Sequence, residues 1–147
     1  MYKHLLVPTD GSKLSAKAVT HSIELAKACG AKLTAFYASP DYPTPVYEEG
    51  VYYMPMKRKE YAARCSKEAD KILKPLISKA QEAGLEASSV HVIAAAPWEA
   101  ILAAARKSKC DAIVMASHGR RGVSALLLGS ETQRVLTHTK LPVIVVR

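Results

Sequence analysis

The sequence predicts an α/β fold, a five-stranded parallel sheet with strand order 3-2-1-4-5 and helices on both faces. Five short apolar runs alternate with segments of helical periodicity along the chain. The strand-like runs are apolar at consecutive positions, as strands buried on both faces require. Right-handed crossovers between such strands favour the doubly wound order.

The chain has the length of one domain, with 147 residues of which 49% are hydrophobic, enough to fill one core. We therefore expect a single domain over residues 1–147. The net charge of +8 favours an anionic partner. The densest basic group, Lys57-Arg58-Lys59, is followed by Glu60 and is typical of a solvated helix face, so nucleic acid is not an expected partner.

The first β-α unit is marked by a short apolar run and a turn. Leu5–Val7 predicts a buried strand that stops at the turn Pro8–Gly11. Apolar residues at three- and four-residue spacing then predict a helix, with Ser12 or Asp10 as its cap. Gly30 predicts its end.

The second unit contains a long connection. Lys32–Ala38 predicts a strand, after which prolines and glycines predict about 15 residues without regular structure. We assign no role to this loop, residues 39–55: its tyrosines would allow it to fold over a ligand or a partner, but a loosely ordered surface loop is the more common structure. A helix is expected over residues 56–83, and Pro75 is expected to kink or divide it.

The remaining elements alternate in the same way. The predicted order is a strand at 87–96, a helix from Pro97, a strand at 111–116, a helix at 130–137 and a final strand at 142–146. The side chains expected to face inward from the two helices are Trp98, Ile101, Leu102, Ala105, Val135 and Leu136.

The spacing of the cysteines and the length of the apolar runs indicate the cellular compartment of the protein. Cys29, Cys65 and Cys110 are odd in number and widely spaced, so they form no recognisable redox, zinc or disulfide pattern. The N-terminal apolar run is too short for a signal peptide, and no segment has the ~20 apolar residues of a membrane span. We expect a soluble, cytoplasmic protein without a membrane partner.

Two distant turns are predicted to form one site. In the expected strand order, strands 1 and 4 are neighbours, and a crevice opens at their carboxyl ends. Asp10 could accept a hydrogen bond from a ribose hydroxyl or an adenine amine, or cap the first helix. Main-chain amides near Gly119 and Gly129, with the Ser130 hydroxyl, could hold phosphates. The two halves suit one nucleotide.

Other residues of the second turn suggest further contacts. His118 has no partner at metal-ligand spacing, so it is expected to orient the loop or contact phosphate. Arg120 and Arg121 could neutralise phosphate charge or remain solvated, and at most one is expected to reach the ligand. The sequence lacks the GxxxxGK[ST], GxGxxG and GxSxG motifs, so P-loop, classical dinucleotide-binding and serine-hydrolase chemistry have no support. We assign no catalytic or metal-binding residue.

The chain resembles the universal stress protein family. The resemblance runs from Leu5–Ser12 through Met115–Gly119 and Leu128–Ser130 to Pro142–Val146. It implies a nucleotide-α-hydrolase-like fold, frequent homodimerisation through the last strand and, in one branch, ATP binding without strong catalysis. The apolar strand at 142–146 suits an edge that pairs with its symmetry mate, although a central strand would have the same composition.

The ATP-binding branch has a Gly-x2-Gly-x9-Gly-Ser/Thr pattern, and here Ala116 stands at its first glycine. Binding is expected to survive unless this position needs a positive φ or very close phosphate contact. The resemblance assigns Asp10 to the adenosine end, the backbone at Ala38 to adenine, and Gly119, Gly129 and Ser130 to the phosphates. Tyr37 precedes Ala38 where the family often has histidine, so the adenine pocket is expected to differ in shape. The full set of candidate nucleotide-binding residues is Pro8, Thr9, Asp10, Ala38, Met115, Ala116, His118, Gly119, Arg120, Gly122, Gly129, Ser130 and Glu131.

The leading hypothesis is a stress-response protein that binds ATP, alone or with Mg²⁺, or a related adenine nucleotide. Occupancy would change contacts within a homodimer or with an unidentified protein partner, because a ligand biases states that it binds unequally. Slow hydrolysis at most is expected. The alternative is a nucleotide-independent dimeric interaction module whose glycines only permit tight turns. An adenylyl-transfer enzyme lacks its expected Ser-Gly-Gly or His-x-Gly-His signature.

Overall fold

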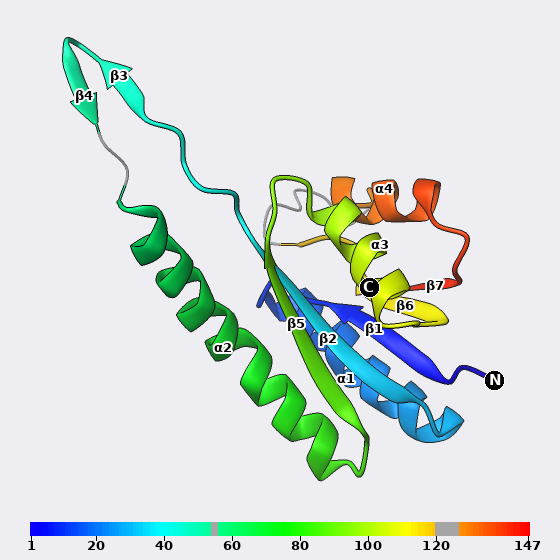
Figure 1. Ribbon diagram of the computed structural model, residues 1–147. Helices are drawn as coiled ribbons and strands as arrows, with labels where there is room; N and C mark the ends of the chain where they lie inside the picture. The colour runs from blue at the N-terminus through cyan, green and yellow to red at the C-terminus, as the bar shows by residue number, and fades with distance from the viewer. Residues whose placement is uncertain (54–55, 120–126) are drawn as a thin grey trace.

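The chain folds around one parallel five-stranded sheet (Figure 1). The computed structural model describes residues 1–53, 56–119 and 127–147. Within them the sheet has the order β5-β2-β1-β6-β7, which is 3-2-1-4-5 when its strands are counted along the chain, as predicted. Its members are β1 (His4–Pro8), β2 (Lys32–Ser39), β5 (Ala87–Ile93), β6 (Ala112–Ala116) and β7 (Val143–Val146).

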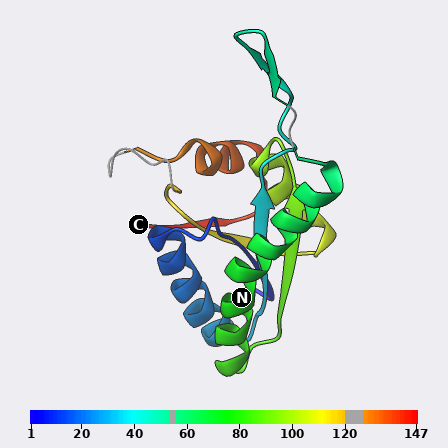
Figure 2. The ribbon, with the colours of Figure 1, turned by 90° about the vertical axis from the view of Figure 1, so that its left-hand side faces the viewer.

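Helices cover both faces of the sheet (Figure 2). One face carries α1 (Lys13–Cys29) and α2 (Arg58–Glu82), and the other carries α3 (Pro97–Lys107) and α4 (Ser130–His138). Because successive strand residues point to opposite faces, Leu5 and Val7 pack beneath α1 and α2 while Leu6 packs beneath α3 and α4. This two-sided burial explains the consecutive apolar residues of β1.

The ends of α1 follow the sequence signals. The Ser12 hydroxyl accepts a hydrogen bond from the Ser15 amide at 3.2 Å, so Ser12 is the N-cap. Gly30 ends the helix at φ 65°, in the left-handed conformation that glycine adopts without a Cβ clash. The N-terminal cap places the turn after β1 in a fixed relation to the sheet.

Pro75 does not divide α2, contrary to one of the two outcomes expected for it. The helix runs without a break from Arg58 to Glu82. Pro75 and Lys71, whose carbonyl loses its helical partner at this point, both lie on the exposed side. Water can therefore satisfy that carbonyl, while the buried residues of the same helix hold it on the sheet.

The connection after β2 contains regular structure, and the prediction of an irregular loop was wrong there. β3 (Val46–Glu48) and β4 (Val51–Tyr53) form an antiparallel hairpin. Glu49 and Gly50, between the strands, both have positive φ, at 48° and 79°. This matches the type I′ turn that suits the twist of a two-residue hairpin loop. The described residues before β3, which include Pro40, Pro43 and Pro45, have no regular structure, as predicted.

The prediction for Leu136 of α4 was also wrong. We expected it to pack inside, but its side chain is 38% exposed, whereas Val135 is fully buried. Only Thr132 and Val135 of α4 are buried, because this short helix lies on the sheet along a narrow stripe. In α3, Ile101, Leu102 and Ala105 are buried as predicted, and Trp98 is half-buried.

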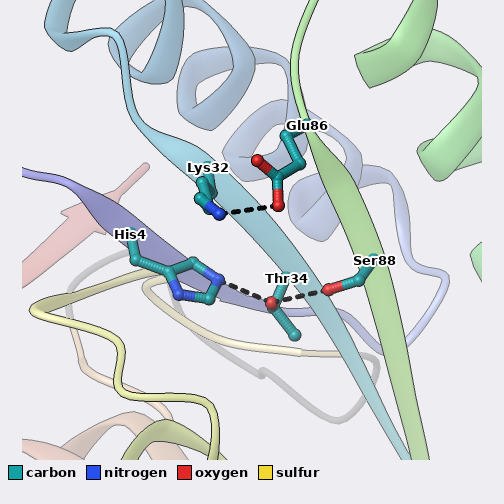
Figure 3. Close-up of polar contacts among 5 residues, drawn as sticks. All are labelled: His4, Lys32, Thr34, Glu86 and Ser88. Atoms are coloured by element: carbon teal, nitrogen blue, oxygen red, sulfur yellow. Dashed lines mark hydrogen bonds and ion pairs between the residues drawn. The ribbon is translucent and has the colours of Figure 1, made fainter.

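Polar side chains tie the strands together at their amino ends (Figure 3). His4 Nε2 lies 2.8 Å from the Thr34 hydroxyl, which lies 2.9 Å from the Ser88 hydroxyl, so one chain of hydrogen bonds crosses β1, β2 and β5. Lys32 and Glu86 add an exposed ion pair at 2.7 Å. These contacts hold the end of the sheet opposite to the carboxyl ends of the strands, where the predicted site lies.

Candidate functional site

The turn after β1 and the segment after β6 meet at the carboxyl edge of the sheet. A Cβ built on Gly119 would lie 2.3 Å from Asp10 Oδ2. The two residues are therefore in direct contact although 108 positions separate them in the chain. β1 and β6 are adjacent parallel strands, and their following helices leave on opposite faces. The predicted convergence of the two turns is confirmed.

The β1 turn is ordered by its own hydrogen bonds. Asp10 Oδ1 accepts from the Ser12 amide at 2.9 Å, and the Thr9 hydroxyl accepts from the Gly11 amide at 3.2 Å. Gly11 has a φ of 76°, which favours glycine. The Thr9 hydroxyl also lies 3.0 Å from that of Ser15. Asp10 therefore orders the turn through Oδ1 while its Oδ2 faces Gly119, and the N-cap of α1 is Ser12 and not Asp10.

The start of α4 is fastened to the end of β6. The Gly129 amide donates to the Ser117 carbonyl at 2.7 Å, and a Cβ at Gly129 would lie 2.9 Å from His118 Cα. The Thr132 hydroxyl donates to the Ala116 carbonyl at 2.9 Å. Close approach of the chain to itself therefore accounts for the glycine at position 129.

This fastening changes which amides face the crevice. The Gly129 amide already has an acceptor, so we no longer expect it to hold phosphate. The first hydrogen bond inside α4 runs from the Gln133 amide to the Gly129 carbonyl. The amides of residues 130–132 precede it and have no partner within the helix. They form the positive end of α4, which favours an anion.

Ala116 lies in an ordinary strand conformation. It is the last residue of β6, pairs with Val146 of β7, and is 8% exposed. The non-glycine residues with positive φ in the described ranges are Glu49 and Lys109, so position 116 does not require the torsional freedom of glycine. The first of the two conditions under which alanine would weaken binding is therefore not met.

Several other predicted site residues are buried or make contacts within the protein. Met115 is 5% exposed and belongs to the core beneath α3 and α4, and Pro8 is also buried. The Glu131 carboxylate accepts from the Trp98 amide at 2.8 Å and lies 3.5 Å from the Arg134 guanidinium. It thus satisfies an amide at the start of α3. Ala38 is half-buried near the carboxyl end of β2.

Half-buried His118 is ordered by its neighbour, since its Nδ1 lies 3.1 Å from the buried Ser117 hydroxyl. Ser130 is exposed, and the start of α4 has no side-chain cap. Arg120, Arg121 and Gly122 lie outside the described residues. The turn regions that are described bring together Asp10, Ser117, His118, Gly119, Gly129 and Ser130.

A polar pair that was not predicted from the sequence lies beside Ala38. His91 Nε2 of β5 lies 2.8 Å from the buried Ser39 hydroxyl, and the His91 ring stacks on Tyr37 at a centroid distance of 5.9 Å. Burial lowers the pKa of His91, against the opposing effect of Asp70. Tyr37 is thus packed against the ring of His91. The alternation of Tyr37 and Ser39 on β2 was the available signal, but the partner on β5 was not identifiable without the strand register.

Two further features of the described ranges concern metal binding and membrane insertion. No three or more His, Cys, Asp or Glu side chains gather there in an arrangement that could hold a metal ion. Among the helices of that same part of the chain, none is both long and apolar enough to cross a membrane.

Comparison with known proteins extends over the whole chain. A model of the universal stress protein family matches residues 1–147. Universal stress protein MJ0531 of Methanocaldococcus jannaschii is 32% identical over 150 residues, which cover 100% of this chain and 83% of that protein. Universal stress protein YxiE of Bacillus subtilis is 32% identical over 149 residues, with 100% of both chains covered.

Solved structures share the architecture. Universal stress protein UspA from Lactobacillus plantarum superimposes with a TM-score of 0.80 at 23% identity, over 99% of this chain and 98% of that one. A universal stress protein in complex with cAMP gives a TM-score of 0.66 at 28% identity, over 99% and 97% of the two chains. The Archaeoglobus fulgidus protein in complex with dAMP gives 0.69 at 19% identity, over 99% and 98%.

Proposed function

Because this chain belongs to the universal stress protein family, we propose that it binds ATP or a related adenine nucleotide and acts as a sensor or regulator in the stress response. The observation that carries the proposal is the contact between Gly119 and Asp10, since it brings the two predicted halves of the site together. Related structures hold cAMP and dAMP, which supports an adenine nucleotide as the ligand class.

In the proposed complex, the phosphates lie at the N-terminus of α4. The amides of residues 130–132 and the exposed Ser130 hydroxyl supply donors, and the helix dipole favours the negative charge. The Cα and Cβ atoms of His118 lie beside this end, and Gly119 follows His118 in the chain. Arg120 and Gly122 belong to the same proposed contact through their sequence positions alone.

The adenosine end is proposed to lie toward β1 and β2. Asp10 would accept a hydrogen bond from a ribose hydroxyl or from the adenine amine, and the Ala38 backbone would contact adenine. The Thr9 turn and the Ser39–His91 pair fix the chain on either side of this position. ATP binds alone or with Mg²⁺, whose coordination the phosphates would share with water.

The regulatory part of the proposal requires unequal binding to two states of the assembly. β7 is an edge strand of the sheet, and its four residues are only half-buried. An unpaired strand edge is a template for pairing, so we propose that two copies associate through β7. The free cysteines 29, 65 and 110 suit a reducing cytoplasm, where we place the protein.

Titration of nucleotide-free protein with labelled ATP tests the binding. We expect saturable binding below millimolar nucleotide, and a roughly tenfold weaker Kd for Ser130→Ala, since the loss of one charge-assisted hydrogen bond is worth about 1.5 kcal/mol. The substitution should leave the unfolding midpoint in urea unchanged, because the Ser130 side chain is exposed and the N-cap of α4 is Gly129.

Ser66→Ala on α2 is the matched control, because Ser66 is also exposed and lies on a different helix from Ser130. Its Kd should equal that of the unchanged protein. Absence of saturable binding at millimolar ATP would overturn the proposal and favour a nucleotide-independent interaction module, for which the contacts of Gly119 and Gly129 within the protein would suffice.

A further inference from the structure

The β3–β4 hairpin extends away from the rest of the molecule (Figures 1 and 2). Its strands pair with each other, and neither packs extensively against another helix or strand of the described chain. The side chains of Val46, Tyr47 and Val51 are 48%, 70% and 51% exposed. A two-stranded hairpin is marginally stable alone in water, and apolar side chains on it gain stability from a partner. We refer to residues 40–56 as the arm.

The base of the arm is held firmly against α2. The Tyr61 hydroxyl of α2 donates to the Pro40 carbonyl at 2.7 Å, and the Tyr42 hydroxyl donates to the Met56 carbonyl. The rings of Tyr42 and Tyr61 meet edge to face at 5.4 Å. The Arg58 guanidinium lies 4.5 Å from the centre of the Tyr42 ring. These contacts give the projecting arm a defined direction, which lowers the entropic cost of engaging a partner.

The charges of the arm are opposite to those of the rest of the chain. None of the 21 Lys and Arg residues lies in residues 40–56, which hold three of the 13 acidic residues. Two of these, Glu48 and Glu49, are exposed at the hairpin tip. A partner that covers this tip should therefore be basic.

The first turn of α2, immediately after the arm, supplies such a surface. Lys57 and Lys59 are exposed on either side of Arg58, and Lys57 makes no side-chain cap of the helix. Positive charge at a helix N-terminus opposes the helix dipole and is unfavourable. Glu60 in the same turn offsets part of this charge, and further carboxylates placed beside the turn would offset the rest. Within one copy, the tip and this turn lie at opposite ends of the arm (Figure 1).

We propose that the arm is a contact between two copies of this chain, with two arms lying antiparallel so that each acidic tip meets the basic first turn of α2 in the other copy. A two-fold axis between the arms makes both contacts equivalent and closes the pair. The exposed residues Val46, Tyr47 and Val51 become covered in the same contact. This interface is separate from β7, which lies on the far edge of the main sheet.

Charge reversal with rescue tests the proposal by sedimentation. Glu48→Lys/Glu49→Lys makes both ends of the arm basic, and Lys57→Glu/Lys59→Glu makes both ends acidic. Each variant alone should associate at least about tenfold more weakly than the unchanged protein, because like charges then face one another across the axis. An equimolar mixture should recover the association, since the basic tip meets the acidic turn and the acidic tip meets the basic turn.

Glu68→Lys/Glu82→Lys is the control for the tip variant, because it makes the same change of net charge as Glu48→Lys/Glu49→Lys on exposed residues of α2. It should associate as the unchanged protein does, and association through β7 is common to all four proteins. Carbodiimide coupling of ¹⁴N- and ¹⁵N-labelled copies should give links between Glu48 or Glu49 of one copy and Lys57 or Lys59 of the other. Equal association of all variants, failure of the mixture to recover, or links within single copies only would overturn the proposal.

Discussion

Gly119 and Gly129 differ in what a side chain would meet. At Gly119 a Cβ would approach Asp10 Oδ2, the mobile end of a side chain, whereas at Gly129 it would approach the backbone of His118. A carboxylate can rotate away at little cost, but a backbone atom cannot move without its strand. Substitution at position 119 should therefore act on the site, and substitution at position 129 on the fold.

We predict that Gly119→Ala weakens ATP binding at least about tenfold with a change below about 0.5 kcal/mol in the free energy of unfolding, because the new methyl displaces the Asp10 carboxylate. Calorimetric titration and urea unfolding measure the two quantities. Ala116→Gly is the companion change, and it should leave the Kd within about threefold because position 116 needs no positive φ. A lower Kd, and so tighter binding, for Ala116→Gly would show that the Ala116 methyl obstructs the phosphates.

A second prediction concerns the Asp111 carboxylate, which accepts from the amides of Lys3 at 2.8 Å and His4 at 3.0 Å. Burial alone would raise the pKa of Asp111, but these hydrogen bonds outweigh burial and lower it. A lowered pKa means that the contribution to stability is present above the unfolded pKa of about 3.9 and is lost as pH falls through the folded pKa.

Asp111→Asn should therefore reduce the free energy of unfolding by about 1 kcal/mol at pH 7, and the difference from the unchanged protein should shrink below pH ~4. Urea unfolding between pH 7 and pH 3 measures it. Glu68→Gln, on the exposed face of α2, should show no such pH dependence. A difference that stays constant over this range would contradict the role assigned to the carboxylate.

At the scale of elements, α4 is positioned by two hydrogen bonds to the strand that precedes it. The Thr132 hydroxyl and the Gly129 amide reach carbonyls at the end of β6, and the Glu131 carboxylate joins α4 to the start of α3. Few apolar side chains of this short helix are buried. Polar contacts therefore determine where its positive end lies relative to the crevice.

Thr132→Val tests this positioning. The substitution keeps the side-chain shape but leaves the buried Ala116 carbonyl without the Thr132 donor, so we predict a loss of about 1–2 kcal/mol in the free energy of unfolding, together with weaker ATP binding. Thr137→Val is the matched control, since its exposed hydroxyl donates to the Gln133 carbonyl within the same helix. Equal losses in the two variants would indicate that the Thr132 contact has no special effect.

At the scale of the whole molecule, the strand order decides which turns meet at the site and which strands lie at the edges of the sheet. Placing β1 beside β6 brings the two turns together, and placing β5 and β7 at opposite edges leaves each with one side unpaired within the described ranges. β5 carries exposed Ser88 and Ser89, whereas β7 is wholly apolar. The composition of β7 favours association, and that of β5 opposes it.

We predict that Val145→Lys on β7 weakens self-association through this edge at least about tenfold, because a charge on an edge strand opposes pairing. Sedimentation equilibrium across micromolar concentrations measures it. Ser89→Lys places the same charge on the opposite edge, at an exposed position of β5, and should leave association unchanged. If neither substitution changes the association constant, β7 is not the interface.

Local signals in the sequence were sufficient for most of the fold. Leu5–Val7 is apolar at consecutive positions, the Ser12 cap and Gly30 bound α1, and the five strand-like runs alternate with helical stripes. Each of these signals is carried by residues close together in the chain, where backbone conformation and burial pattern are set. The same pattern also predicted that the turns after β1 and β6 would meet.

Tertiary structure decided what depends on partners distant in sequence. The contact of Asp10 Oδ2 with Gly119, the pairing of Ser39 with His91 and the attachment of Glu131 to α3 each join residues from different elements. The exposure of Leu136 depends on how α4 lies on the sheet. Strand register and the packing of layers fix these contacts, and neither quantity is encoded in a single short stretch of sequence.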